Sequence, residues 1–172
     1  MIKIRPLTLT IFLYCCLVGI SNAQVEKLKA AYLYNFATMT NYPPSLQGGN
    51  FVIAVLGNDP VIAELEAIAK TKKIGSQPIV VKKINSVAEI EQAQIVFVPD
   101  DNKSKMADII SKTSSGATVV VAESDGACTK GAIFNLVLVD QKLRFEVNED
   151  KANSKGVKLA ANLVKLGIPV KG

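Results

Sequence analysis

The chain of 172 residues has 20 lysine and arginine residues against 15 aspartate and glutamate residues, and it contains no histidine. The missing histidine excludes Ser-His-Asp and Cys-His nucleophile systems, an imidazole general base and histidine-ligated zinc. The basic residues form no run interleaved with aromatic residues, so the pattern also argues against nucleic-acid binding.

The first 23 residues have the pattern of a secretory signal peptide. A basic start precedes an apolar stretch, Leu7–Ile20, that is too short to span a bilayer comfortably, and small residues near Ala23 fit a signal-peptidase site. We expect cleavage after Ala23, a periplasmic location, and a single α/β domain over residues 24–172. An uncleaved membrane anchor is the alternative.

Cleavage would leave Cys128 as the only one of the three cysteines. An exported domain with a single thiol has no internal disulfide and no thiolate metal site, so its stability must come from the core. Cys128 could pair between chains or react, but we favour a role as a small apolar filler because no histidine can activate it.

The segment Lys29–Pro43 predicts a helix that ends at a proline. Helical spacing places Tyr32, Asn35 and Phe36 on one stripe, which we expect to face the core. A buried Asn35 amide would need hydrogen-bond partners, so this residue is a candidate for ligand contact. The alternative, which we favour, is that the stripe only packs the helix against a sheet.

Four apolar segments rich in β-branched residues then alternate with helical patterns. The strands are predicted at residues 51–57, 77–84, 94–100 and 117–124. Alternation of this kind implies right-handed crossovers between parallel strands. We therefore expect one domain with three α/β/α layers around a twisted, mostly parallel sheet.

The alternation changes after residue 131. Two strands, 132–139 and 142–148, are separated only by Asp140 and Gln141, which predicts an antiparallel hairpin at one edge of the sheet.

Three polar residues of this hairpin are candidates for binding. Arg144 and Glu146 share the wet face of the expected edge strand, where they could pair with each other, and Arg144 could anchor an interface. Asn135 lies inside an apolar strand, so its amide needs partners. A hydrogen bond between Asn135 and Asn35 would close a small pocket.

Two further candidates lie at the carboxyl ends of predicted strands, where open α/β sheets bind ligands. Asp59 follows the first strand, but it also fits a helix N-cap before Pro60. Asp125 lies in the loop Glu123–Ala132, which is rich in small residues. This loop is either a mobile binding loop or a plain connection.

Four stretches together resemble the YfiR family of bacterial periplasmic proteins. They span nearly the whole predicted mature chain, and their order and spacing also match the family. The stretches are KAAYLYNFATMTNYP (29–43), FVIAVLGNDP (51–60), KGAIFNLVLVDQKLRFEVN (130–148) and SKGVKLAANLVKLG (154–167). Some relatives carry disulfide cysteines, whereas only Cys128 would remain here, and Ala160 and Ala161 replace a serine pair of the closing helix.

The resemblance implies regulation rather than catalysis. In this family the periplasmic protein represses an inner-membrane diguanylate cyclase by binding its periplasmic sensor portion, and an outer-membrane lipoprotein with a peptidoglycan-binding domain sequesters the repressor. Related domains occur fused to signalling proteins, so a sensor kinase is another expected partner, and a homodimer through the edge strand is an option.

The alternative function is that of a periplasmic receptor for a small ligand. We expect no catalytic residue, no metal and no cofactor, because histidine and a glycine-rich phosphate loop are both missing from the sequence. The candidate residues for binding a partner or ligand are Asn35, Asp59, Asp125, Asn135, Arg144 and Glu146.

Overall fold

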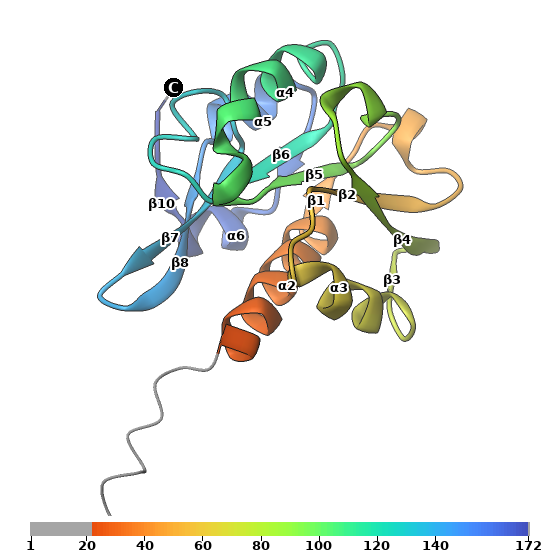
Figure 1. Cartoon of the computed structure of the whole chain (residues 1–172). Coiled ribbons are helices and arrows are strands. Elements are labelled where there is room, and N and C mark those ends of the chain that lie inside the picture. Colours follow the sequence, from red (N-terminus) through yellow and green to blue (C-terminus); the bar gives the residue numbers. More distant parts are fainter. Residues whose placement is uncertain (1–21, 172) are drawn as a thin grey trace, which may run out of the picture.

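The computed structural model describes residues 22–171. The predicted signal peptide lies outside the described residues except for its last two, which begin the first helix, so cleavage after Ala23 stays a prediction. Within the described part of the chain, no helix combines the length and the apolar character that a membrane span requires. The described residues form one mixed α/β unit (Figure 1).

An eight-stranded sheet runs through the molecule in the order β10-β8-β7-β6-β5-β2-β4-β3. Its strands β4, β2, β5, β6 and β7 are parallel, and the pairs β7–β8 and β3–β4 are antiparallel. A separate two-stranded sheet joins β1 (Thr40–Asn41) to β9 (Lys158–Leu159). The strands of the large sheet are β2 (Phe51–Leu56), β3 (Lys73–Ile74), β4 (Gln77–Ile84), β5 (Ile95–Val98), β6 (Val119–Ala122), β7 (Phe134–Val139), β8 (Lys142–Val147) and β10 (Ile168–Pro169). The prediction of a mostly parallel α/β sheet is thus confirmed.

The chain places β4 on one side of β2 and then crosses back to place β5 on the other side. The direction of winding therefore reverses between β2 and β5, and in open α/β sheets ligands bind beyond the carboxyl ends of strands at such a point.

Buried side chains cover both faces of the parallel strands, because successive residues of a strand point to opposite faces. On one face Ile53, Val55 and Phe97 join the larger core cluster with residues of α2 and α3. On the other face Ala54, Leu56 and Val98 pack with residues of α4. The α-helices are α2 (Asn22–Thr38), α3 (Val61–Ala69), α4 (Met106–Lys112), α5 (Glu149–Ser154) and α6 (Ala161–Leu166), and the 3-10 segments are η2 (Pro44–Leu46), η3 (Val87–Glu89) and η4 (Asp100–Lys105).

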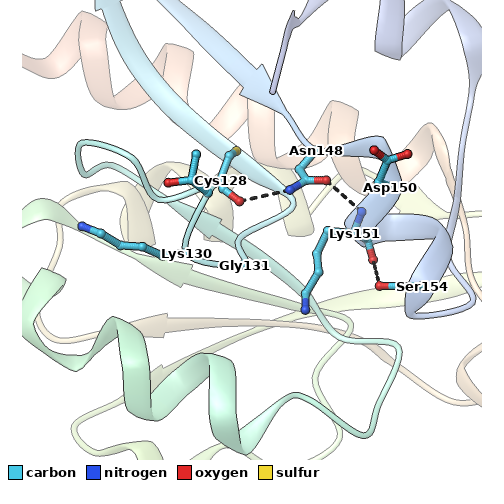
Figure 2. A pocket seen from close by; sticks show the side chains of 8 residues that line it. Cys128, Lys130, Gly131, Asn148, Asp150, Lys151 and Ser154 are labelled. Atoms are coloured by element: carbon cyan, nitrogen blue, oxygen red, sulfur yellow. Dashed lines mark hydrogen bonds between the residues drawn. The ribbon is translucent and has the colours of Figure 1, made fainter. Parts of the chain in front are cut away.

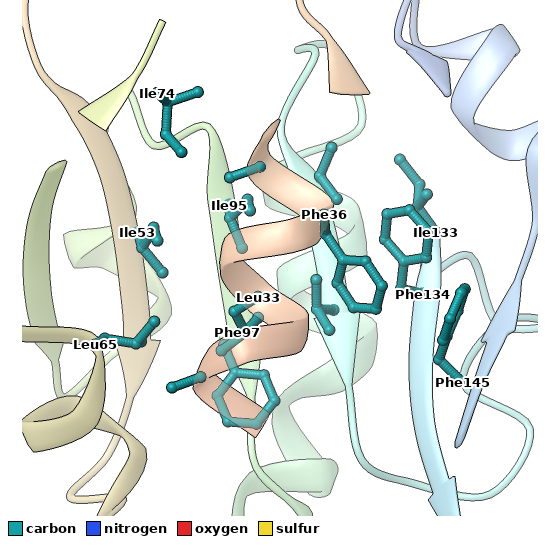
Figure 3. Packing of buried hydrophobic residues seen from close by; sticks show 14 of the residues in the cluster. Leu33, Phe36, Ile53, Leu65, Ile74, Ile95, Phe97, Ile133, Phe134 and Phe145 are labelled. Atoms are coloured by element: carbon teal, nitrogen blue, oxygen red, sulfur yellow. The ribbon is translucent and has the colours of Figure 1, made fainter. Parts of the chain in front are cut away.

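Helix α2 packs on the sheet through an aromatic cluster (Figure 3). The ring of Phe36 stacks on Phe134 with centroids 4.0 Å apart, and Phe145 meets Phe36 edge-on at 5.1 Å. Phe36 is fully buried, as are the small and apolar residues Ala30, Leu33 and Ala37 on the same side. The packing interpretation of this helix is therefore supported.

The predicted orientation of α2 was wrong in one respect. Asn35 is exposed rather than core-facing, and Leu28, which shares its side of the helix, is 44% exposed. The face that contacts the sheet carries Ala30 and Ala37, whose small side chains let the helix approach closely. In the sequence, the large side chains of Tyr32 and Phe36 suggested that the core-facing stripe lies on a different side of the helix, the side that includes Asn35. Helix α2 also ends at Thr38, before the proline that was expected to end it.

The hairpin β7–β8 turns through Asp140 and Gln141, which have φ angles of 49° and 60°. Positive φ at both central residues is the geometry of a type I′ turn, whose twist matches that of the strands. The hairpin tip projects beyond the rest of the sheet (Figure 1).

Strand β8 is not the outermost strand that the sequence suggested, because β10 pairs with it at Glu146 and Val147. Gly167 makes this pairing possible. A Cβ at this position would lie 2.6 Å from the ring of Phe145 and 2.7 Å from a methyl group of Val147. Only a residue without a side chain fits at that distance.

Candidate functional site

The carboxyl ends of β5 and β6 border a hollow of about 480 Å³, which we call the acidic groove. One wall comes from the first turns of α2 and the other from the hairpin β7–β8. The lining residues are Val25, Lys29, Asp100, Glu123, Ser124, Asp125, Leu136, Val137, Leu138 and Leu143. The groove thus combines apolar walls with three carboxylate residues and one lysine.

A compact ion cluster joins α2 to Glu123, just after the end of β6, at this groove. Lys29 Nζ lies 2.9 Å from Glu123 Oε1 and 3.0 Å from Glu26 Oε1, and the three side chains are each about 85% buried. The second oxygen of Glu26, Oε2, is buried without a hydrogen-bond partner among the described residues. One ammonium group therefore neutralises two carboxylates only in part, which leaves a negative charge that favours cationic groups.

The pKa values of this cluster follow from its burial and charges. Burial raises the pKa of Glu123 above its ordinary value of 4.5, while Lys29 opposes the rise and the charges of Asp59 and Glu26 add to it. Burial lowers the pKa of Lys29, but the hydrogen bonds and charges of Glu123 and Glu26 outweigh this effect and raise it above 10.5. Lys29 therefore carries its full charge at neutral pH.

Asp59 serves as the predicted helix cap. Its Oδ1 atom accepts a hydrogen bond of 2.8 Å from the backbone N–H of Val61, at the start of α3. Asp59 follows β2, which runs parallel to β5 and β6, so it lies at the same edge of the sheet as the acidic groove. From there its charge adds to the rise in the pKa of Glu123. Asp125 is exposed and lines the groove directly.

Asn135 is almost completely buried, and both ends of its amide are satisfied. Its Oδ1 atom accepts from the backbone N–H of Ser124 at 3.1 Å, and its Nδ2 atom donates to Glu146 Oε2 at 2.8 Å. The hydrogen bond suggested between Asn135 and Asn35 is therefore not formed. Instead, Asn135 fixes the start of the loop that borders the acidic groove.

Arg144 is exposed and lies opposite Val137 in the hairpin register. Among the described residues it makes no ion pair with Glu146, whose carboxylate accepts from Asn135. Arg144 is thus available on the surface of the hairpin, while Glu146 has a structural partner.

The loop Glu123–Ala132 is tied down by internal hydrogen bonds. The N–H of Ala132 donates to the Ala127 carbonyl at 3.0 Å, and Asn148 Nδ2 donates to the Cys128 carbonyl at 3.1 Å. Ala127 and Cys128 are fully buried. These contacts favour the interpretation of the loop as a firm connection whose rim carries Asp125.

A second hollow of about 460 Å³ lies beside Cys128 and the start of α5 (Figure 2). Asn148 caps α5 there, because its Oδ1 atom accepts from the Lys151 N–H at 2.8 Å. Burial, followed by the charge of Glu146, raises the pKa of the Cys128 thiol to about 12. A thiol with this pKa is a poor nucleophile at neutral pH.

Within residues 22–171, no group of three or more histidine, cysteine or acidic side chains is arranged to hold a metal ion. The sequence reasoning missed the roles of Glu26, Lys29 and Glu123. Glu123 directly follows a predicted parallel strand, so its position at the carboxyl end was an available signal. The two residues of α2 gave no such signal, since their contact with Glu123 depends on how the helix is placed over the sheet.

A comparison with curated proteins gave no match. Among solved structures, the chain is similar to the crystal structure of a conserved domain protein from Vibrio cholerae O1 biovar El Tor, with a TM-score of 0.61 and 12% sequence identity. The similarity covers 85% of this chain and 60% of that one, so it shows a shared fold over part of a longer protein. The family described as YfiR/HmsC-like matches residues 26–168. The chain therefore belongs to the YfiR/HmsC-like family.

Proposed function

We propose that this protein is a non-enzymatic periplasmic regulator of cyclic-di-GMP signalling. In this proposal it binds the periplasmic portion of an inner-membrane diguanylate cyclase or sensor kinase reversibly and holds that protein inactive. The observation that carries the proposal is the family match over residues 26–168, which includes the hairpin and every lining residue of the acidic groove except Val25. An outer-membrane peptidoglycan-binding lipoprotein that competes for the regulator and a homodimeric form are parts of the same proposal.

The surface that we assign to the membrane partner joins the acidic groove to the hairpin tip. Leu138 is 72% exposed and lies directly opposite Leu143, which also lines the groove. Large apolar side chains left in solvent beside charged groups are typical of protein interfaces. Arg144 lies on the neighbouring strand and can supply a polar anchor at the margin of this surface.

The experiment is a pull-down from solubilised envelope with the purified protein as bait, followed by mass spectrometry. We expect a membrane cyclase or kinase to be retained and the Leu138→Asp variant to lose it. Leu166→Asp is the matched control, because Leu166 is 64% exposed on α6, outside this surface. Retention of no signalling protein by a folded bait would contradict the proposal.

A small-ligand receptor is the second candidate, and the acidic groove is the observation that favours it. Its volume of about 480 Å³ lies in the range of ligand sites, and the carboxylates of Asp100, Glu123 and Asp125 in its lining would accept from a cationic group. A thermal-shift screen with amino acids and nucleotides tests this function. A saturable rise in melting temperature that disappears in Glu123→Gln, but persists in the exposed control Glu66→Gln, would support it.

A further inference from the structure

The outer edge of β4 is open over most of its length. Residues Ile79–Ile84 pair with Phe51–Leu56 of β2 on one side, whereas β3 covers only Gln77 and Pro78 on the other. Figure 1 shows β4 near this end of the sheet with the short β3 beside its beginning. An edge of six residues without a partner strand in the described structure offers backbone donors and acceptors to another chain.

The strand β8 at the opposite end of the sheet is partly covered. There β10, which contains a proline, pairs with the end of β8, and the Val170 N–H donates to the Val147 carbonyl at 2.9 Å. The Tyr32 hydroxyl covers another part of β8 by donating to the Leu143 carbonyl at 3.0 Å. A strand added at this end would therefore meet β10 and Tyr32, whereas residues Ile79–Ile84 of β4 have no partner strand on their outer side in the described structure.

A hollow of about 360 Å³ adjoins the open edge. Its apolar lining residues are Val52, Ala54, Ala93 and Val80, which is 38% exposed, and its polar lining residues are Lys82, Glu89, Glu91 and Gln92. Side chains of a strand alternate between the two faces of a sheet. A strand added beside β4 would therefore direct every second side chain toward the face on which Val80 lies, where an apolar residue can fill the hollow.

The charged residues of β3 and β4 themselves are all lysines, while Glu89 and Glu91 lie in the lining of the neighbouring hollow. Lys73 of β3 and Lys83 of β4 have no carboxylate within 4.0 Å among the described residues, and Lys82 pairs with Glu91 at 2.9 Å. A second copy of the chain would bring the lysines of both β4 strands into one short ladder, where like charges repel. In an acidic segment, by contrast, the carboxylates would lie close to the ammonium groups of these lysines and would be attracted to them.

We propose that the open edge of β4 binds an extended acidic segment of a partner protein by strand addition. Backbone hydrogen bonds along Ile79–Ile84 hold the segment, an apolar side chain of the segment enters the hollow beside Val80, and its carboxylates pair with Lys73 and Lys83. Strand addition takes its affinity from the main chain and its selectivity from alternate side chains. This surface is separate from the acidic groove, so it can be tested without the membrane partner.

The test selects binders to the exported protein, expressed from the full chain, from a display library of random short peptides. We expect the enriched peptides to combine an apolar residue with acidic residues and to slow amide hydrogen exchange at Ile79–Ile84. Val80→Asp should abolish binding, and Lys73→Glu combined with Lys83→Glu should weaken it about five- to tenfold. The matched control is Lys112→Glu combined with Lys165→Glu, two exposed lysines on α4 and α6, and it should bind normally.

Four results would overturn the proposal. The selection could yield no binder. It could yield peptides that lack acidic residues, or peptides that slow hydrogen exchange in a part of the chain other than Ile79–Ile84. Sedimentation could also reveal a dimer that Val80→Asp dissociates, which would make a second copy the occupant. The hydrogen-exchange measurement uses the unmodified protein, so it decides the question even if a variant fails to fold.

Discussion

Replacing Phe36 by alanine removes the central ring of the core between α2 and the sheet. Phe36 is fully buried, and its ring lies 4.0 Å from that of Phe134, 5.1 Å from Phe145 and 5.9 Å from Tyr32. Truncation of a buried phenylalanine costs about 3–5 kcal/mol, and each lost aromatic pair adds to the burial term. We therefore expect a loss of about 4 kcal/mol in the free energy of unfolding.

The neighbouring substitution Asn35→Ala should have almost no effect. Asn35 is exposed, and alanine is the better helix former, so the change in the free energy of unfolding should stay within about 0.5 kcal/mol. A buried, hydrogen-bonded asparagine would instead cost about 1–3 kcal/mol when removed. The pair of variants therefore tests which face of α2 contacts the sheet.

Urea unfolding followed by far-ultraviolet circular dichroism measures both variants. For a slope of about 2 kcal/mol/M, Phe36→Ala should lower the midpoint by about 2 M. Leu28→Ala is a control on the same helix, because Leu28 is 44% exposed and its truncation should cost less than about 1 kcal/mol. A cost above about 1 kcal/mol for Asn35→Ala, or below it for Phe36→Ala, would refute the orientation of the helix.

Three further predictions concern single positions. Gly167→Ala should destabilise the protein by about 1–3 kcal/mol, because its Cβ would overlap Phe145, whereas Gly48→Ala, with no atom within 4 Å, should be nearly neutral in the same unfolding assay. Because the folded-state pKa of Glu123 is raised, its contribution to stability is full below pH 4.5 and is lost as the pH rises through the folded-state pKa. Glu123→Gln should remove this part of the pH dependence of unfolding. The Cys128 thiol should resist a thiol-specific reagent at neutral pH until urea unfolds the chain, and rapid labelling of the native protein would contradict its burial.

Local patterns predicted much of the fold. The bounds of β4 agree with the predicted strand at 77–84, and the two-residue turn at Asp140 and Gln141 connects the predicted hairpin. The helix cap of Asp59 was also recognisable, since a short polar side chain before a helical pattern has few other roles. These features depend on residues that are close together in the chain.

Features that depend on distant contacts could not be predicted in the same way. The cluster of Lys29 with Glu123 joins residues 94 positions apart, and its existence depends on how α2 lies on the sheet. Strand β10 has only two residues, and pairing with β8 rather than local propensity defines it. The real partners of Asn135, the N–H of Ser124 and the carboxylate of Glu146, likewise come from the register of the sheet.

The most direct test of the proposed regulatory function is the signalling output of a strain that lacks this protein but contains the proposed membrane partner. We expect deletion to raise cyclic-di-GMP, or to activate a cognate kinase, and the intact gene to restore the low output. The Leu138→Asp variant should fail to restore it, whereas Leu166→Asp should succeed. An output that does not change on deletion would contradict the account.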